Sequence, residues 1–125
     1  MLPEAMQKVI KLEEIEPVEI RPGLFVRALA VVDNFSVVLV ESPPGNYFQV
    51  AHPEAEFVYV LRGQADYDDG RIAKAGDSLI NLPNMPHPFR TVGDEPMVIL
   101  EIKSPPPPLY VDLLKAQQDR RKISG

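Results

Sequence analysis

The stretch "AHPEAEFVYVLRGQ", residues 51–64, decides the fold. Its second half, from Glu56 to the residue before Gly63, is an apolar run of the length and composition of a β-strand. Successive side chains of a strand point to opposite faces, so Glu56 shares one face with Val58 and Val60. A carboxylate on an inward apolar face is costly without a partner, and a cation or an arginine can serve as that partner.

Short apolar runs separated by turn residues continue on both sides of this stretch, within about residues 18–104. They are bounded by segments such as "RPG", "SPPGN", "DDG" and "GDEP", which favour turns. The chain has 14 prolines, which argue against a helical bundle. Several short strands with regular turns predict an all-β sandwich or small barrel. Only "LYVDLLKAQQDRRK", about residues 109–122, has the spacing of a helix.

Composition and charge limit the possible classes of function. A length of 125 residues fits one domain covering 1–125, with a core of its own. The net charge of -5 argues against a nucleic-acid partner, and no apolar segment is long enough to span a membrane. Because there are no cysteines, disulfides, thiolate metal sites and a cysteine nucleophile are excluded. The first residues lack the apolar run of a secretory signal, so we expect a cytoplasmic location.

The two histidines of the chain, His52 and His87, both stand at predicted transitions from turn to strand, beside prolines. Together with Glu56 they make two imidazoles and one carboxylate, a ligand set that holds Fe(II) with open positions. Zn, Mn and Ni accept the same ligands. Spacing alone does not show whether the three side chains meet, and two separate surface histidines are the alternative.

From about Arg21 to Leu114 the sequence resembles the cupin superfamily. The first cupin motif runs Gly, a spacer, His-x-His, three or four residues, Glu, six residues, Gly. The second runs Gly, five residues, Pro-x-Gly, two residues, His, three residues, Asn. The motif positions that this chain matches are Gly45, His52, Glu56 and Gly63 in the first motif, and Gly76 and His87 in the second.

This resemblance implies a double-stranded β-helix, the jelly-roll barrel of the cupins, followed by a short C-terminal helix. It also implies that His52, Glu56 and His87 hold a divalent transition metal, either Fe, Mn, Ni or Zn, inside the barrel. The "ESPPG" and "IKSPP" segments resemble, more loosely, the small cupins related to pectin degradation.

Several positions depart from the cupin pattern. Val50 stands where the first histidine is expected, and the spacer before it is one residue short. Gln49 could supply an oxygen ligand if the short loop shifts the register, because a slip of one residue swaps faces. Glu54 is expected in the solvated turn. Asn84 replaces the second-motif glycine, and asparagine tolerates a positive φ better than most residues.

Three further side chains are candidates for a substrate pocket. Arg27 lies in "LFVRALA" and could bind a substrate carboxylate bidentately, or could be a surface arginine. Tyr47 and Phe89 could line the pocket, and Phe89 shares the strand parity of His87.

The resemblance implies an enzyme that uses its metal on a small organic acid or sugar-derived substrate, as an oxygenase, isomerase or lyase. The alternative is a non-catalytic cupin that binds a small ligand or has lost its metal, which Val50 favours. We also expect a homodimer, with "VEIRPGLFVRALA" as the candidate edge, because a long unpaired sheet edge is otherwise a liability.

Overall fold

The computed structural model describes residues 9–67 and 70–124. Residues 1–8, 68–69 and 125, which include part of the predicted "DDG" turn and of the predicted domain, lie outside the described residues. Within the described residues the elements in chain order are a 3-10 turn, η1 (Leu12–Glu14), ten strands, β1 (Val18–Arg21), β2 (Leu24–Val31), β3 (Ser36–Ser42), β4 (Tyr47–Val50), β5 (Ala55–Arg62), β6 (Gln64–Tyr67), β7 (Arg71–Lys74), β8 (Ser78–Asn81), β9 (His87–Val92) and β10 (Met97–Ser104), and one helix, α1 (Pro108–Ser124).

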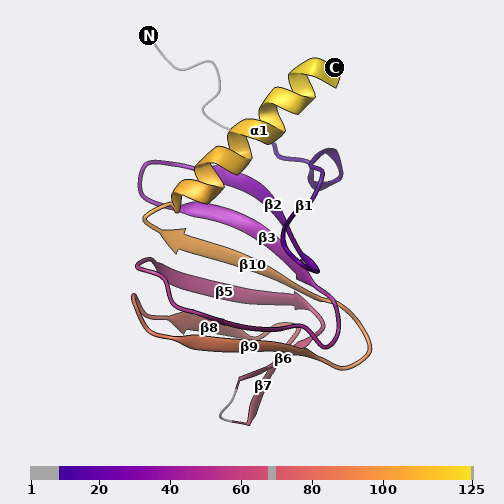
Figure 1. The fold of residues 1–125 in the computed structure, drawn as a ribbon, viewed down its shortest axis with the longest axis vertical. Coiled ribbons are helices and arrows are strands. Elements are labelled where there is room, and N and C mark those ends of the chain that lie inside the picture. Colours follow the sequence, from indigo (N-terminus) through magenta and orange to yellow (C-terminus); the bar gives the residue numbers. More distant parts are fainter. Residues whose placement is uncertain (1–8, 68–69, 125) are drawn as a thin grey trace.

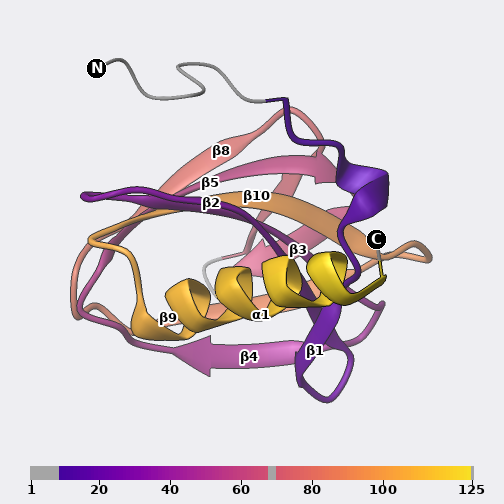
Figure 2. The same cartoon turned by 90° about the horizontal axis from the view of Figure 1, so that it is seen from above.

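The strands form two antiparallel sheets (Figure 1). The larger sheet has the order β1-β2-β3-β10-β5-β8, and the smaller has the order β4-β9-β6-β7. Figure 2 shows β4 and β9 on the opposite side of the molecule from β5 and β8. This confirms the predicted all-β jelly-roll sandwich. The part of the chain that the structure describes has no helix long and apolar enough to cross a membrane.

The core lies between the sheets and is built from the inward positions of their strands, with two residues of α1 added to it. Along β5, Glu56, Val58 and Val60 are buried, whereas the intervening side chains are 38–46% exposed. The alternation predicted from the sequence is therefore confirmed. The buried apolar cluster consists of Val26, Ala28, Val38, Val40, Val58, Val60, Ala65, Met97, Ile99, Tyr110 and Leu113.

Helix α1 lies across one end of the sandwich (Figures 1 and 2). It begins at Pro108, a residue suited to the first turn of a helix, and matches the predicted helix to within two residues. Gln117 is buried and forms two hydrogen bonds with Ala28 in β2. Its Oε1 accepts from the Ala28 N–H at 3.2 Å, and its Nε2 donates to the Ala28 oxygen at 3.0 Å. Ala28 lies beside a register shift in the pairing of β2 with β3, and the pairing of β2 with β1 stops at Val26, so Gln117 takes the place of a strand partner for these backbone groups.

Two backbone positions explain motif residues. Gly63, between β5 and β6, has a φ of +78°, and a Cβ there would lie 2.8 Å from the Cα of Met97. Only glycine fits both the conformation and the close approach. Asn84 has a φ of 61°, which confirms that asparagine replaces the motif glycine at a left-handed position.

Candidate metal centre

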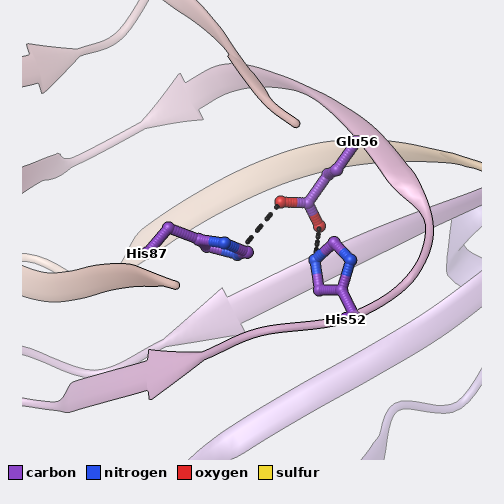
Figure 3. Close-up of side chains that lie close together, drawn as sticks. All are labelled: His52, Glu56 and His87. Carbon is purple, nitrogen blue, oxygen red and sulfur yellow. Dashed lines mark ion pairs between the residues drawn. The ribbon is translucent and has the colours of Figure 1, made fainter. Parts of the chain in front are cut away.

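Three segments bring His52, Glu56 and His87 together between the sheets. His52 lies in the loop between β4 and β5, Glu56 is the second residue of β5, and His87 is the first residue of β9. Figure 3 shows the two imidazoles converging on the carboxylate. The larger sheet therefore supplies the carboxylate, and the smaller sheet and its connecting loop supply the two rings.

The distances fit a shared ligand sphere. His87 Nε2 lies 3.7 Å from Glu56 Oε1, and His52 Nε2 lies 3.8 Å from Glu56 Oε2. The two rings meet edge to face, with centroids 4.9 Å apart. One donor atom from each of the three residues lies within 4.8 Å of the others. Two ligands of one ion are at most about 4.2 Å apart when each bond is about 2.1 Å long, and both nitrogen–carboxylate distances, 3.8 and 3.7 Å, are below that limit.

Backbone carbonyls fix which nitrogen of each ring faces the site. His52 Nδ1 is 2.9 Å from the Glu54 oxygen, and His87 Nδ1 is 3.1 Å from the Met85 oxygen. A carbonyl only accepts hydrogen bonds, so each neutral ring carries its hydrogen on Nδ1 and presents the Nε2 lone pair to the centre. This arrangement is typical of metal-binding histidines.

The strongest sign that these residues fit a metal is the state of His52 Nε2. This atom is buried and has no hydrogen-bond partner among the described residues. A buried polar atom without a partner costs about 1–3 kcal/mol, and a metal–nitrogen bond would remove that cost. Two imidazole nitrogens and one carboxylate are also a donor set that divalent Fe, Mn, Ni and Zn accept.

Glu54 differs from its expected position in the solvated turn. It is only 8% exposed, and its Oε1 lies 3.5 Å from His52 Nδ1. The sequence interpretation was wrong here because the turn folds the side chain back against the imidazole. Glu54 therefore helps to orient His52 through both its backbone and its carboxylate.

Besides the two histidines, Glu56 has a polar neighbour on each adjoining strand. Asn81 Nδ2 in β8 donates to Glu56 Oε1 at 2.7 Å, and Lys103 Nζ in β10 lies 3.6 Å from Glu56 Oε2. Both are direct register partners of Glu56 across the sheet. The ladder that aligns β8, β5 and β10 thus sets the carboxylate between an amide and an ammonium.

Lys103 also belongs to a cluster with Glu101 and Tyr110. Its Nζ lies 3.8 Å from Glu101 Oε1 and 3.4 Å from the Tyr110 oxygen, which donates to Glu101 Oε1 at 3.2 Å. Burial, together with the nearby charge of Glu56, raises the pKa of Glu101 to about 8. Burial, reinforced by the Glu101 charge, raises the pKa of Tyr110 above its usual range. Glu101 is therefore largely protonated at neutral pH.

A cavity of about 270 Å³ extends from the three candidate ligands toward helix α1. Phe89 lines this cavity, as predicted, and its ring centroid is 6.1 Å from that of Phe48. Arg21, at the end of β1, also lines the cavity.

The other three sequence candidates lie elsewhere. Arg27 has the opposite strand parity to the cavity-lining Val26, and its Nε donates to the Ile15 oxygen at 3.0 Å. Tyr47 is 43% exposed and stacks with Arg90, whose Cζ is 5.0 Å from the ring centroid.

Gln49 is exposed and does not line the cavity. In β4 it pairs with Pro88, while the cavity-lining Phe48 pairs with Phe89. Tyr47 and Gln49 therefore occupy the face of β4 opposite to Phe48, and the structure does not bring them to the centre.

Several site residues were not identified from the sequence. The charged pair in "LEIKS" follows Met97 and Ile99 at intervals of two, and this period places Glu101 and Lys103 on the inward face. This period of two could have been read from the sequence. The site residues on other elements join the cavity through tertiary contacts, which the spacing of residues along the sequence does not reveal. The site residues missed in the sequence are Arg21, Asn81, Glu101, Lys103 and Tyr110.

Comparison with known proteins agrees with this geometry. The family model of the cupin domain matches residues 38–103, a range that contains all three candidate ligands. No curated protein matches the chain.

Solved structures share the fold at low sequence identity. KdgF from Halomonas sp. has a TM-score of 0.73 at 16% identity, over 80% of this chain and 94% of that chain. The polyketide cyclase RemF from Streptomyces resistomycificus has a TM-score of 0.70 at 20% identity, over 79% and 80%. A predicted oxalate decarboxylase from Thermotoga maritima has a TM-score of 0.69 at 20% identity, over 78% and 98%. At these identities the likeness shows the fold alone.

Proposed function

Because the chain belongs to the cupin family, we propose that it is a metal-dependent enzyme acting on a small organic substrate in its barrel cavity. The metal would be a divalent transition ion held by His52, Glu56 and His87. The observation that carries this proposal is the buried, unpartnered Nε2 of His52, which faces the same carboxylate as His87 Nε2. Three protein ligands leave positions open for water or substrate, as catalysis requires.

When bound, a divalent metal supplies Lewis acidity toward a substrate oxygen. The remaining chemistry would come from the chain's own groups. Lys103, Glu101 and Tyr110 form a connected cluster beside Glu56, and each can hold or pass a proton. Helix α1 covers this end of the cavity through Tyr110, which restricts the access of water.

The reaction class stays open among oxygenase, isomerase and lyase. The similar structures include a polyketide cyclase and a predicted oxalate decarboxylase, so one fold carries different chemistries. What supports a substrate with a metal-binding oxygen, such as an organic acid, is the position of the candidate metal ligands in the cavity wall.

A second candidate function is a binding module that works without a metal. The observation that favours it is the ammonium of Lys103, which lies 3.6 Å from Glu56 Oε2 and already neutralises part of its charge. Val50, which stands where the cupin pattern has its first histidine, also favours this alternative. In this alternative, Glu56 is a structural ion-pair partner, and the cavity binds its ligand without a Lewis acid.

Elemental analysis separates these candidates. The protein is purified without chelator, and its metal content is compared with that of His87→Ala and of Gln49→Ala as a matched control. The first proposal predicts about one ion per chain in the parent and in Gln49→Ala, and a large loss in His87→Ala with the fold retained by circular dichroism. Metal content near zero in the parent, even after incubation with Fe(II), Mn(II), Ni(II) and Zn(II), would favour the metal-free binding module.

We also propose that the protein is a cytoplasmic homodimer. Support for the dimer comes from β1, which forms one edge of the larger sheet and leaves one row of backbone groups unpaired within the described chain. The predicted edge segment also includes β2, which is an interior strand, so within that segment β1 alone is an edge strand. Light scattering at micromolar concentration that reports only the 14.0 kDa monomer would contradict this proposal.

A further inference from the structure

Apart from His52, His87 and Arg21, the polar groups of the cavity wall contact one another. Asn81 donates to Glu56. Lys103, Glu101 and Tyr110 bond among themselves, and Lys103 also contacts Glu56. These groups therefore have little capacity left for hydroxyl groups on a ligand.

Arg21 is the exception among the charged groups of the wall. It lines the cavity but is exposed, and the described part of the chain gives its guanidinium neither a hydrogen bond nor an ion pair. Its Cζ lies 5.9 Å from the ring centroid of Phe48, so the guanidinium is held over an aromatic face. All its N–H donors stay available, in a planar fork that matches a carboxylate.

The rest of the wall is apolar. It includes aromatic rings and aliphatic side chains of the inner sheet faces, among them Phe48, Phe89, Leu24, Val26, Val58 and Ile99. A ligand hydroxyl buried against these side chains would lose its water without gaining a partner. An apolar ligand body would instead gain from removal of its surface from water.

These observations distinguish between the two substrate classes that the sequence left open. We propose that the cavity selects a small carboxylate with an apolar, preferably planar, body, which Arg21 recognises, and that it discriminates against polyhydroxylated sugar acids. The metal-facing end of this ligand carries an oxygen, and that part alone rests on the proposed metal function. Arg21 thus has the role that the sequence gave to Arg27, whose Nε is bound to a backbone oxygen.

Three probes of related shape or charge test this selectivity. 4-Hydroxybenzoate has a carboxylate, an aromatic body and a phenolic oxygen. 4-Hydroxybenzamide keeps the shape without the charge, and gluconate keeps the charge on a polyhydroxylated chain. Calorimetric titration into the full chain, once loaded with Zn(II) and once with chelator, gives the affinity for each probe. Arg21→Met is compared with Arg62→Met, which changes an exposed arginine paired with Glu95 outside the cavity.

We expect 4-hydroxybenzoate to bind at least about tenfold more tightly than either comparison probe. Arg21→Met should remove the preference for the acid over the amide, while Arg62→Met should keep it. Gluconate binding as tightly as the aromatic acid, an unchanged preference in Arg21→Met, or no binding of the aromatic acid at millimolar concentration would each overturn the proposal.

Metal content, measured on the same samples, keeps the two proposals apart. A stoichiometric ion without selectivity for the aromatic acid would refute the inference and leave the metal function standing. Selectivity through Arg21 that persists in chelated, metal-free protein would support the inference even if no metal binds.

Discussion

Replacing Lys103 by methionine should strengthen metal binding while weakening the metal-free fold. The Lys103 side chain is 13% exposed and the Glu56 side chain 5%, and the ammonium lies 3.6 Å from Glu56 Oε2. Methionine keeps much of the side-chain volume but removes the charge. In the metal-free protein the change removes the ammonium from Glu56, which keeps the hydrogen bond from Asn81.

The size of the effect follows from a thermodynamic cycle. At an effective dielectric constant of about 20, two unit charges 3.6 Å apart attract by about 5 kcal/mol. Desolvation of the ammonium offsets part of this attraction, and removal of one partner from a buried pair typically costs about 3 kcal/mol or more. Glu101 adds little to the attraction at neutral pH because burial raises its pKa to about 8.

A bound metal would neutralise Glu56 itself, so the loaded variant should lose little stability. The difference between the two forms, about 3 kcal/mol, corresponds to metal binding that is roughly 100-fold tighter. Urea unfolding with chelator and with Zn(II) measures both stabilities, and competition with a chromophoric chelator measures the affinity. Lys74→Met, at an exposed lysine of β7, is the control. Weaker metal binding in Lys103→Met, or equal destabilisation of both forms, would refute the reasoning.

Three further variants test the fold and the electrostatics of the site. Gln117→Leu removes two hydrogen bonds to the bulged part of β2 and should cost about 2–4 kcal/mol in urea unfolding, whereas Lys115→Ala on the exposed face should cost little. Gly63→Ala should unfold at much lower urea than Gly93→Ala, because both glycines have a positive φ but only at Gly63 would the added Cβ meet backbone. Burial raises the pKa of Glu101 from 4.5 to about 8. Between these pH values the metal-free native protein therefore binds more protons than the unfolded chain. Its stability should therefore fall as pH rises from 5 to 8 relative to Glu101→Gln, and parallel pH profiles of the two proteins would contradict this.

The fold could be predicted because its determinants are local and repeated. The alternation in β5, the turn residues between strands and the spacing of the two cupin motifs all indicate the same sandwich. Strand β4 was not predicted, because it has only four residues after the "PPGN" turn, too few to show the two-residue period of a strand. Arg27 was misplaced as a candidate because the sequence does not show which face of β2 is inward, and its neighbour Val26 lines the cavity instead.

The site could be predicted only as far as its motif residues. His52, Glu56 and His87 stand at positions that a family pattern marks, and the structure brings them together. Lys103 and Asn81 are 47 and 25 residues from Glu56 along the chain, and only the register of β10 and β8 makes them neighbours. Such pairings follow from sheet topology, which spacing does not reveal.

The most direct test of the central claim uses the fact that the chain has only two histidines. Long-range proton–nitrogen correlation spectra resolve all four imidazole nitrogens of the ¹⁵N-labelled protein during titration with Zn(II). If His52, His87 and Glu56 form a metal centre, both Nε2 signals shift together and saturate at one equivalent, while both Nδ1 atoms keep their protons. Imidazole signals that stay unchanged at saturating Zn(II), or a response from one ring only, would contradict the claim that this chain carries a metal centre.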